Sequence, residues 1–277
     1  MIRLLGKVRK YTKIFIEIGG LSASVAFVMC SQIEDANAAT VMPADITVWR
    51  SASGIWWVMG GSDSQQVTQQ WGMSGDKPVP GDYDDDGKTD FAIFRPDTTN
   101  HVGNWYLLYS ASNSWTQVQW GLDTDISNLT PADFDGDGRT DLGLWRASND
   151  GWYILKSSDN QALSFTFGTS GDKPAPADYD GDGKADVAVW RSSNKTFYSI
   201  NSSNSVSQIV TFTQASSEPV TADYDGDGKA DIAVWKDSTG NWYIRKSGSG
   251  GALRQDQWGQ SGDIPVPAFY RRYISIH

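Results

Sequence analysis

The chain has 277 residues, of which 39% are hydrophobic and 12% aromatic, and its formal net charge at pH 7 is −10. The excess of acidic residues disfavours binding to nucleic acid or to an anionic membrane surface, because these carry charge of the same sign. Thirteen Trp and 28 Gly in a polar chain are typical of short strands joined by tight turns, and they argue against long helices.

The first 38 residues have the layout of a signal peptide. Five basic residues precede an apolar run from about Ile18 to Met29, and Ala36-Asn37-Ala38 supplies a small-x-small cleavage pattern. The run is too short to span a membrane comfortably. We therefore expect cleavage after Ala38 and one secreted domain, 39–277, that is extracellular, with the periplasm or the cell surface as alternatives.

Two other interpretations of the leader are an uncleaved membrane anchor and a lipoprotein modified at Cys30. The second is disfavoured because Met29 is larger than the small residue that lipid attachment requires. Cleavage would remove the only cysteine and leave 18 basic and 30 acidic groups, a net charge of −12. The mature protein then has no disulfide, thiolate metal site or cysteine nucleophile, so packing and ions must hold the fold.

A seven-residue motif that begins Thr-Asp or Ala-Asp and ends in an aromatic and a basic residue occurs five times along the chain. Its aspartates follow one another at intervals of 45, 51, 45 and 45 residues, and the extra six residues fall in loops. Such self-similarity is typical of repeat architectures. The repeat units are 45–89, 90–140, 141–185, 186–230 and 231–277.

Each unit contains four short strand candidates, which in the last full turn of the repeat are 220–224, 232–236, 241–246 and 254–258. Both faces of the second strand are apolar, since Ile232 and Val234 alternate with Ala233 and Trp235. A sheet that is covered on both faces without helices must lie between other sheets. The sequence therefore predicts an all-β fold, a five-bladed β-propeller with four-stranded blades of about 45 residues.

The two ends of the domain predict how the ring closes. The first unit begins at a second strand, and the chain ends after another first-strand sequence, Pro265 to Tyr270. The C-terminal strand can therefore complete the first blade beside three N-terminal strands. Closure of this kind hides the sheet edges that an open array would expose.

Eleven of the tryptophans occupy three fixed positions of the repeat. We interpret them as inter-blade core, because aromatic residues that keep repeat register are more often packing than sugar-binding residues. Trp115 lies off these positions. It is the better candidate for an exposed contact.

Between the first and second strands, four units carry the pattern D-x-D-x-D-G-x-x-D, which holds 16 of the 30 acidic groups of the mature chain. Two like charges about 4 Å apart cost about 4 kcal/mol at an effective dielectric constant near 20, so a cation must offset the repulsion. Oxygen ligands from a flexible loop suit Ca²⁺, whereas Mg²⁺ demands a stricter octahedron. We predict about four calcium ions.

The predicted ligands are the carboxylates at positions 1, 3, 5 and 9 of each loop and the backbone carbonyl at position 7. They are Asp82, Asp84, Asp86, Lys88 and Asp90; Asp133, Asp135, Asp137, Arg139 and Asp141; Asp178, Asp180, Asp182, Lys184 and Asp186; and Asp223, Asp225, Asp227, Lys229 and Asp231. An EF-hand is excluded, because its twelfth position needs a bidentate Glu, where these loops have Ile93, Leu144, Val189 and Val234.

Loops such as Asp178 to Asp186, followed by Val-Ala-Val-Trp, resemble FG-GAP/VCBS repeats, the integrin-α-like calcium-binding blades, over about residues 45–270. The resemblance implies a β-propeller, an extracellular location and calcium in each loop. Five blades are fewer than the seven associated with the family, which leaves an incomplete or larger assembled ring open. The fifth loop cannot bind calcium, because Phe269 to Tyr273 stand where the other loops have their first aspartates. Its ninth residue, Asp45, is still an aspartate. The loop is divided between the two ends of the chain, which explains the loss.

Three functions are compatible with this sequence. The first, which we favour, is a monomeric extracellular binding or adhesion module for carbohydrate or protein, with calcium that is structural rather than ligand-bridging. The second is a structural surface component with no specific ligand. The third, a secreted hydrolase or lyase, is disfavoured because His101 and His277 are the only histidines and no G-x-S-x-G is present. We expect no enzyme activity and no catalytic residue.

A basic residue ends the second strand of every unit, and together these residues predict a basic ring opposite the calcium loops. They are Arg50, Arg95, Arg146, Arg191 and Lys236. An anionic ligand is one candidate partner for the ring. We favour instead pairing with Asp76, Asp172 and Asp263 of the Ser-Gly-Asp turns.

Overall fold

The computed structural model describes residues 45–60, 66–211, 218–248 and 250–266. The predicted leader and the predicted fifth loop, 269–273, lie outside the described residues. Within the described ranges, no helix is both long enough and apolar enough to cross a membrane.

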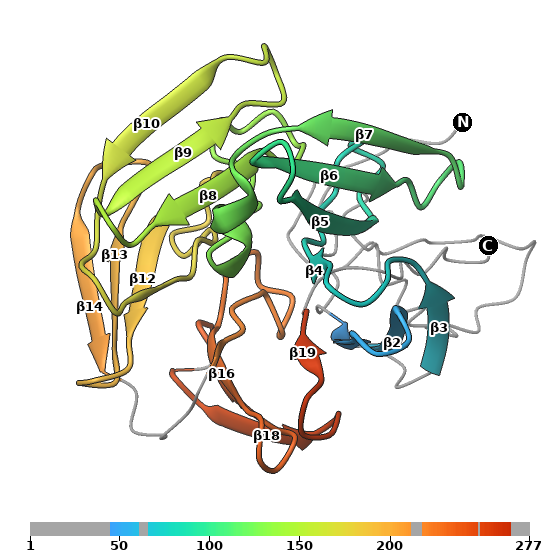
Figure 1. Cartoon of the computed structure of the whole chain (residues 1–277). Helices are drawn as coiled ribbons and strands as arrows, with labels where there is room; N and C mark the ends of the chain where they lie inside the picture. The colour runs from blue at the N-terminus through green and yellow to red at the C-terminus, as the bar shows by residue number, and fades with distance from the viewer. Residues whose placement is uncertain (1–44, 61–65, 212–217, 249, 267–277) are drawn as a thin grey trace, which may run out of the picture. The chain divides into compact units, whose positions relative to one another are not determined.

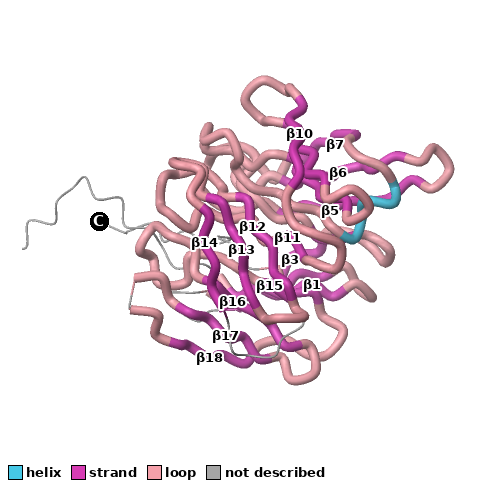
Figure 2. The backbone as a smooth tube through the Cα atoms, turned by 90° about the vertical axis from the view of Figure 1, so that its left-hand side faces the viewer, coloured by secondary structure: helices cyan, strands magenta, loops and turns pink. Residues whose placement is uncertain are grey.

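The described chain folds into five antiparallel sheets that form a five-bladed β-propeller, which confirms the predicted fold class (Figure 1). The side view shows that strands and loops make up almost all of the described residues, among which helix is confined to one short segment (Figure 2). This segment is the 3-10 helix η1 (Asp123–Ser127).

From the inner to the outer edge, the blades have the following strands. Blade one consists of β19 (Ile264–Pro265), β1 (Ile46–Arg50), β2 (Ile55–Met59) and β3 (Gln66–Gln70). Blade two consists of β4 (Lys77–Pro78), β5 (Phe91–Asp97), β6 (Val102–Leu108) and β7 (Trp115–Gln119). In blade three a single bridge between Leu129 and Leu144 takes the inner place beside β8 (Leu142–Arg146), β9 (Gly151–Leu155) and β10 (Ala162–Thr166). Blade four consists of β11 (Lys173–Pro174), β12 (Val187–Arg191), β13 (Thr196–Ile200) and β14 (Ser207–Thr211), and blade five of β15 (Glu218–Pro219), β16 (Ile232–Lys236), β17 (Asn241–Arg245) and β18 (Leu253–Gln257).

The predicted second strand, 232–236, agrees with β16, and the third and fourth strands differ from the prediction by one residue. The predicted first strand, 220–224, was wrong, because the inner strand β15 ends at Pro219. The Val220 amide still donates to the Ala233 carbonyl at 2.9 Å, but the Tyr224 amide donates to the Asp231 side chain. The side chains of the aspartate loop thus take over the hydrogen bonds that a longer strand would make.

The ring closes through blade one. Strand β19 pairs with β1, with Pro265 opposite Val48, and the Val266 amide donates to the Thr47 carbonyl at 2.8 Å. In Figure 1 the C-terminal β19, in red, lies beside the blue strands of the N-terminal blade. The predicted arrangement of one C-terminal and three N-terminal strands is confirmed.

Apolar contacts between neighbouring blades form the core. Trp49 and Trp56 of blade one cluster with Ile93 of blade two, and Trp190 of blade four clusters with Val234 of blade five. The indoles of Trp49 and Trp56 both donate to the Trp71 carbonyl, at 3.2 and 3.0 Å, so their polar atoms are satisfied inside the core. The tryptophans of the first two repeat positions are fully buried and confirm the predicted inter-blade core; they are Trp49, Trp145, Trp190 and Trp235, and Trp56, Trp105, Trp152 and Trp242.

Truncation tests the role of the closing strand. A mature chain that ends at Gly262 lacks β19, the buried Val266 and the partner of Arg50, and we expect it to lose at least about 3 kcal/mol of stability. A chain that ends at Val266 is the matched control. Urea unfolding of both chains measures the difference, and equal stabilities would show that the last strand does not close the ring.

Candidate metal centres

Each aspartate loop connects the inner strand of a blade to its second strand. The loops are loop one (82–90), loop two (133–141), loop three (178–186) and loop four (223–231). Each is closed by a bridge between the residue before position 1 and the aspartate at position 9, such as Ala132 with Asp141. The four aspartates at position 9 are completely buried, at 0% exposure. The sheet therefore fixes where each loop starts and ends.

The structure brings three carboxylates together in every loop, with one oxygen from each within 4.8 Å of the others. In loop one they come from positions 1, 3 and 5, and in the other loops from positions 1, 3 and 9. The clusters are Asp82, Asp84 and Asp86; Asp133, Asp135 and Asp141; Asp178, Asp180 and Asp186; and Asp223, Asp225 and Asp231. The predicted carboxylate ligands left outside these clusters are Asp90, Asp137, Asp182 and Asp227.

The residue at position 7 lies in the turn of each loop, where its amide donates to the carboxylate at position 5. The distances are 2.7 Å for Lys88, 2.9 Å for Arg139, 2.9 Å for Lys184 and 3.0 Å for Lys229. The predicted contribution of their carbonyls to a metal ion stays a prediction.

The aspartate at position 1 is oriented by the backbone of its own loop. In loop two, Asp133 accepts the amides of Gly136 at 2.6 Å and Gly138 at 2.9 Å, one on each carboxylate oxygen. Loops three and four repeat this pair of hydrogen bonds. Both glycines have positive φ, +79° and +89°, a conformation that favours glycine. The backbone of the turn thus orients both oxygens of the first carboxylate.

The aspartate at position 9 connects the loop to the end of the third strand. Asp90 accepts the Tyr83 amide at 2.9 Å and the Ser110 amide at 2.7 Å. Burial raises the pKa of Asp90 to about 6, although these two hydrogen bonds act to lower it. Burial also raises the pKa of six further loop aspartates, namely Asp82, Asp133, Asp141, Asp186, Asp223 and Asp231. Negative charge at these sites is therefore costly until a cation offsets it.

In two of the four loops, the carboxylate at position 3 has a buried oxygen without a hydrogen-bond partner. One Oδ1 atom in loop two, of Asp135, and one in loop four, of Asp225, are buried without a hydrogen-bond partner. A buried acceptor without a donor is costly, and a bound cation would satisfy it. Since every atom that could ligate a metal ion in the cluster is an oxygen, the loops fit a hard cation such as Ca²⁺.

Serines after the third strand complete the loops, and sequence reasoning missed them. Ser157, Ser202 and Ser247 donate their hydroxyls to the carboxylate at position 5, at 2.9, 2.8 and 3.0 Å. Their amides donate to the aspartate at position 9. The available signal is that each stands 20 residues after position 5 of its loop. Serine hydroxyls thus hold the fifth-position carboxylates at the edge of the cluster.

Hydrogen bonds join each loop to the next around the ring. The amide at position 8 donates to the carbonyl at position 1 of the preceding loop, from Thr140 to Asp82 at 2.6 Å and from Ala185 to Asp133 at 2.7 Å. Ala230 donates in the same way to Asp178 at 2.7 Å. The four loops therefore form one hydrogen-bonded chain, in which the order of one loop supports that of its neighbour.

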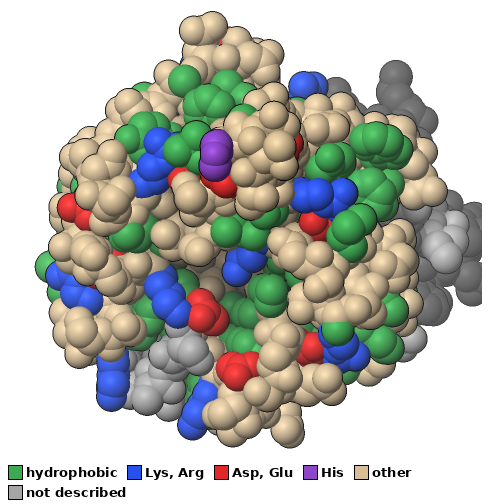
Figure 3. Space-filling model, in the orientation of Figure 1, with side chains coloured by type: hydrophobic (Ala, Val, Ile, Leu, Met, Phe, Trp, Pro, Cys, Tyr) green, Lys and Arg blue, Asp and Glu red, His purple; other side chains and the backbone are tan. Residues whose placement is uncertain are grey.

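The basic residues at the other end of the second strands are neutralised by ion pairs. Arg50, Arg95 and Arg191 pair with Asp263, Asp76 and Asp172 at 2.7–2.8 Å, which confirms the pairing that we favoured. Figure 3 shows basic and acidic side chains next to one another around the hollow centre of one face. These three arginines thus do not offer free positive charge to an anionic ligand.

The other two members of the predicted ring differ. Arg146 pairs with Asp125 of η1 at 2.8 Å, a partner that sequence reasoning missed because blade three has no Ser-Gly-Asp turn. Lys236 makes no ion pair with any residue in the described ranges.

His101, weighed as a catalytic base, has a side chain that is 79% exposed and that contacts Asp123 at 3.3 Å. Trp115 is 59% exposed, which confirms the expectation of an exposed residue.

The raised pKa values predict an opposite pH dependence with and without calcium. Asp90 has a folded pKa of about 6 against an ordinary value of 3.8, so between these values the folded state keeps a proton that the unfolded state has lost. The stability that this group contributes is therefore fully present below about pH 3.8 and is lost as the pH rises through about 6. Calcium reverses the trend because it binds the ionised carboxylates.

Melting temperatures of the chelated and the calcium-loaded protein between about pH 4 and pH 7 measure this dependence. The chelated protein should lose stability with rising pH, and the Asp90→Asn variant should show a weaker loss. A chelated protein that becomes more stable over this range would contradict the account.

A single substitution tests the assignment of ligands to one loop. Asp135→Asn removes a charge and weakens the ligand at position 3, so the variant should bind one cation fewer than the unmodified protein in native mass spectrometry with calcium. Asp97→Asn, at a partly exposed residue outside the loops, is the matched control and should bind the full number. If Asp135→Asn binds as many ions as the control, loop two is not a metal centre.

Comparison with known proteins agrees with the repeats. A family model described as the FG-GAP-like repeat matches residues 82–144 and 178–234, and these two stretches contain all four aspartate loops. No curated protein matches the sequence significantly.

Three solved structures can be aligned with most of this chain, at low similarity. A lectin of Agrocybe aegerita that recognises non-reducing terminal N-acetylglucosamine is 12% identical over 79% of this chain and 77% of its own, with a TM-score of 0.43. A catalytically inactive virginiamycin B lyase of Staphylococcus aureus is 11% identical over 80% and 73%, with a TM-score of 0.41. The calcium-binding protein regucalcin of Agrobacterium tumefaciens is 11% identical over 79% and 75%, with a TM-score of 0.40. At this level of similarity none of the three indicates a ligand or an activity for this chain. The chain is a five-bladed β-propeller that carries FG-GAP-like repeats at residues 82–144 and 178–234.

Proposed function

We propose that the protein is a secreted, non-enzymatic binding module that acts as a monomer and recognises extracellular carbohydrate or protein. Its four aspartate loops each hold a structural calcium ion. The observation that carries the calcium assignment is the cluster of three carboxylates in every loop, with one oxygen of each within 4.8 Å of the others. In loops two and four the clustered aspartate at position 3 also has a buried oxygen without a hydrogen-bond partner.

The contacts of the loops support a structural role for the ions. Asp141 of loop two connects its loop to Ser157, which follows the third strand, and the carbonyl of Asp133 connects the same loop to blade four. An ion held by these two aspartates would fix strands of one blade and its neighbour together. Because the ion binds only the folded state, it stabilises the fold by RT ln(1 + [L]/Kd) per site, so even weak sites contribute at high calcium concentration.

Charge supports the same proposal. Four calcium ions would change the net charge of the mature chain from −12 to −4 and relieve the repulsion within the loops. Calcium that is abundant outside cells suits a protein with the leader described above. Within the described residues, the exposed His101 contacts the carboxylate of Asp123 and no nucleophile. This supports a binding function over hydrolase or lyase activity.

A screen of the mature protein, 39–277, on glycan and protein arrays tests the binding function. We expect saturable binding to a restricted set of glycans or proteins in the presence of calcium. If calcium is structural, binding should persist in chelator at a temperature at which circular dichroism shows that the fold is intact. Loss of binding from intact protein would instead make the ion part of the ligand site, and no binding on either array would favour a structural surface component.

A further inference from the structure

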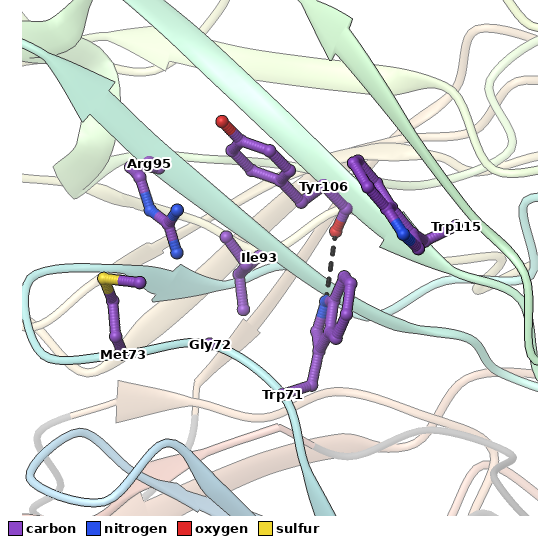
Figure 4. Close-up of a pocket in the computed structure, with 7 residues that line it drawn as sticks. All are labelled: Trp71, Gly72, Met73, Ile93, Arg95, Tyr106 and Trp115. Atoms are coloured by element: carbon purple, nitrogen blue, oxygen red, sulfur yellow. Dashed lines mark hydrogen bonds between the residues drawn. The ribbon is translucent and has the colours of Figure 1, made fainter.

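A cavity of about 320 Å³ lies between blades one and two, a size within the lower range of small-ligand sites. Its lining comes from the end of blade one and from three strands of blade two (Figure 4). The residues are Trp71, Gly72, Met73, Ile93, Arg95, Tyr106 and Trp115. Three of these side chains are aromatic, and a single residue carries a charge.

Trp115 is the residue that distinguishes this cavity. It is the first residue of β7, opposite Leu108, and is 59% exposed. The same register position in the other blades holds smaller or more flexible side chains, namely Gln66, Ala162, Ser207 and Leu253. The fold therefore does not require an aromatic ring at this position. An exposed tryptophan that lines the same cavity as the 55% exposed Met73 indicates a binding surface.

The charged residue of the cavity is held in place by two contacts. The guanidinium of Arg95 donates through Nε and Nη2 to both oxygens of the buried Asp76, each at 2.7 Å. It also lies over the ring of Tyr106, 4.9 Å from the centroid. Such a group is preorganised as a donor, because little side-chain entropy remains to be lost when a ligand binds.

The chemistry of the cavity favours a neutral ligand. Asp76 already neutralises Arg95, and the whole chain carries a net charge of −10, so an anion gains little there. The Trp115 and Tyr106 rings, with centroids 6.3 Å apart, provide flat apolar area beside this polar pair. A pyranose ring matches both features, since it has an apolar C–H face for an aromatic ring and hydroxyls that accept hydrogen bonds.

Neighbouring blades provide an internal comparison. Between blades two and three, Arg146 lies over Tyr153, and between blades three and four, Arg191 lies over Tyr198. The equivalent positions in blades three and four thus have the same pair of arginine and tyrosine. At the register position of Trp115, however, they have Ala162 and Ser207.

We propose that the cavity between blades one and two is a carbohydrate subsite, in which Trp115 stacks on the apolar face of a neutral pyranose residue. Arg95, on the other side of Tyr106, donates hydrogen bonds to hydroxyls of the bound carbohydrate. The proposal rests on the binding function above and specifies one ligand class and one place for it.

Titration of single sugars tests the subsite. The probes are the methyl pyranosides of glucose, galactose, mannose and N-acetylglucosamine, with glucuronic acid as an anionic probe, followed by ligand-observed NMR and tryptophan fluorescence. We expect at least one neutral pyranoside to bind better than glucuronic acid. Trp115→Ala should weaken this binding at least about tenfold, as expected for an aromatic anchor, while Trp115→Tyr should retain part of it.

Leu253→Ala is the matched control, because Leu253 takes the same register position in blade five and is 54% exposed. It should leave sugar binding and the melting temperature unchanged, and Trp115→Ala should leave the melting temperature unchanged.

The subsite is refuted if no neutral pyranoside binds, if glucuronic acid binds best, or if Trp115→Ala binds as well as the unmodified protein. Array binding that survives in Trp115→Ala would refute the subsite and leave the binding function standing, whereas an unmodified protein that binds nothing on the arrays would refute both.

Discussion

Each blade with an aspartate loop is organised around one buried carboxylate, the ninth residue of that loop. In blade three this is Asp141, which accepts one amide from its own loop, of Phe134, and one from the turn after the third strand, of Ser157. Two hydrogen bonds thus join the start of the second strand to the end of the third. The same burial that makes these bonds strong makes the negative charge costly, and the surrounding carboxylates increase that cost. A cation bound beside this carboxylate would offset that cost.

The blades depend on one another as well as on their own loops. Apolar side chains of each second strand pack against the neighbouring blade, and loop-to-loop hydrogen bonds such as that from Ala185 to Asp133 follow the same neighbours. The closing pair of β19 and β1 removes the two exposed edges that a linear array would have. With the ring closed, differences between blades can be confined to exposed positions. Trp115 is one such position, where blade two presents an aromatic ring and blade three presents Ala162.

Much of the fold could be predicted from the sequence, because the same pattern of apolar, aromatic and turn residues occurs five times. The apolar faces of the second strand, the position of Trp49 and its equivalents, and the closing C-terminal strand all follow from periodicity. The pairing of Arg95 with Asp76 could be predicted because both residues recur at fixed places in the repeat. The partner of Arg146 could not, because Asp125 lies in a short helix outside the repeat pattern. The contacts of the serines with the loops and the cavity beside Trp115 could not be predicted either. Both depend on distances between segments, which cannot be deduced from the spacing of residues along the chain.

The most direct test of the central claim is the anomalous diffraction of a crystal of the mature protein grown with calcium. Four anomalous peaks are expected, one in each aspartate loop, each about 2.3–2.6 Å from carboxylate oxygens at positions 1 and 3. The peak in loop two should lie beside Asp135 Oδ1, the buried oxygen that has no donor in the protein. Four well-ordered loops without anomalous density at a high calcium concentration would contradict the claim that the blades are built around bound ions.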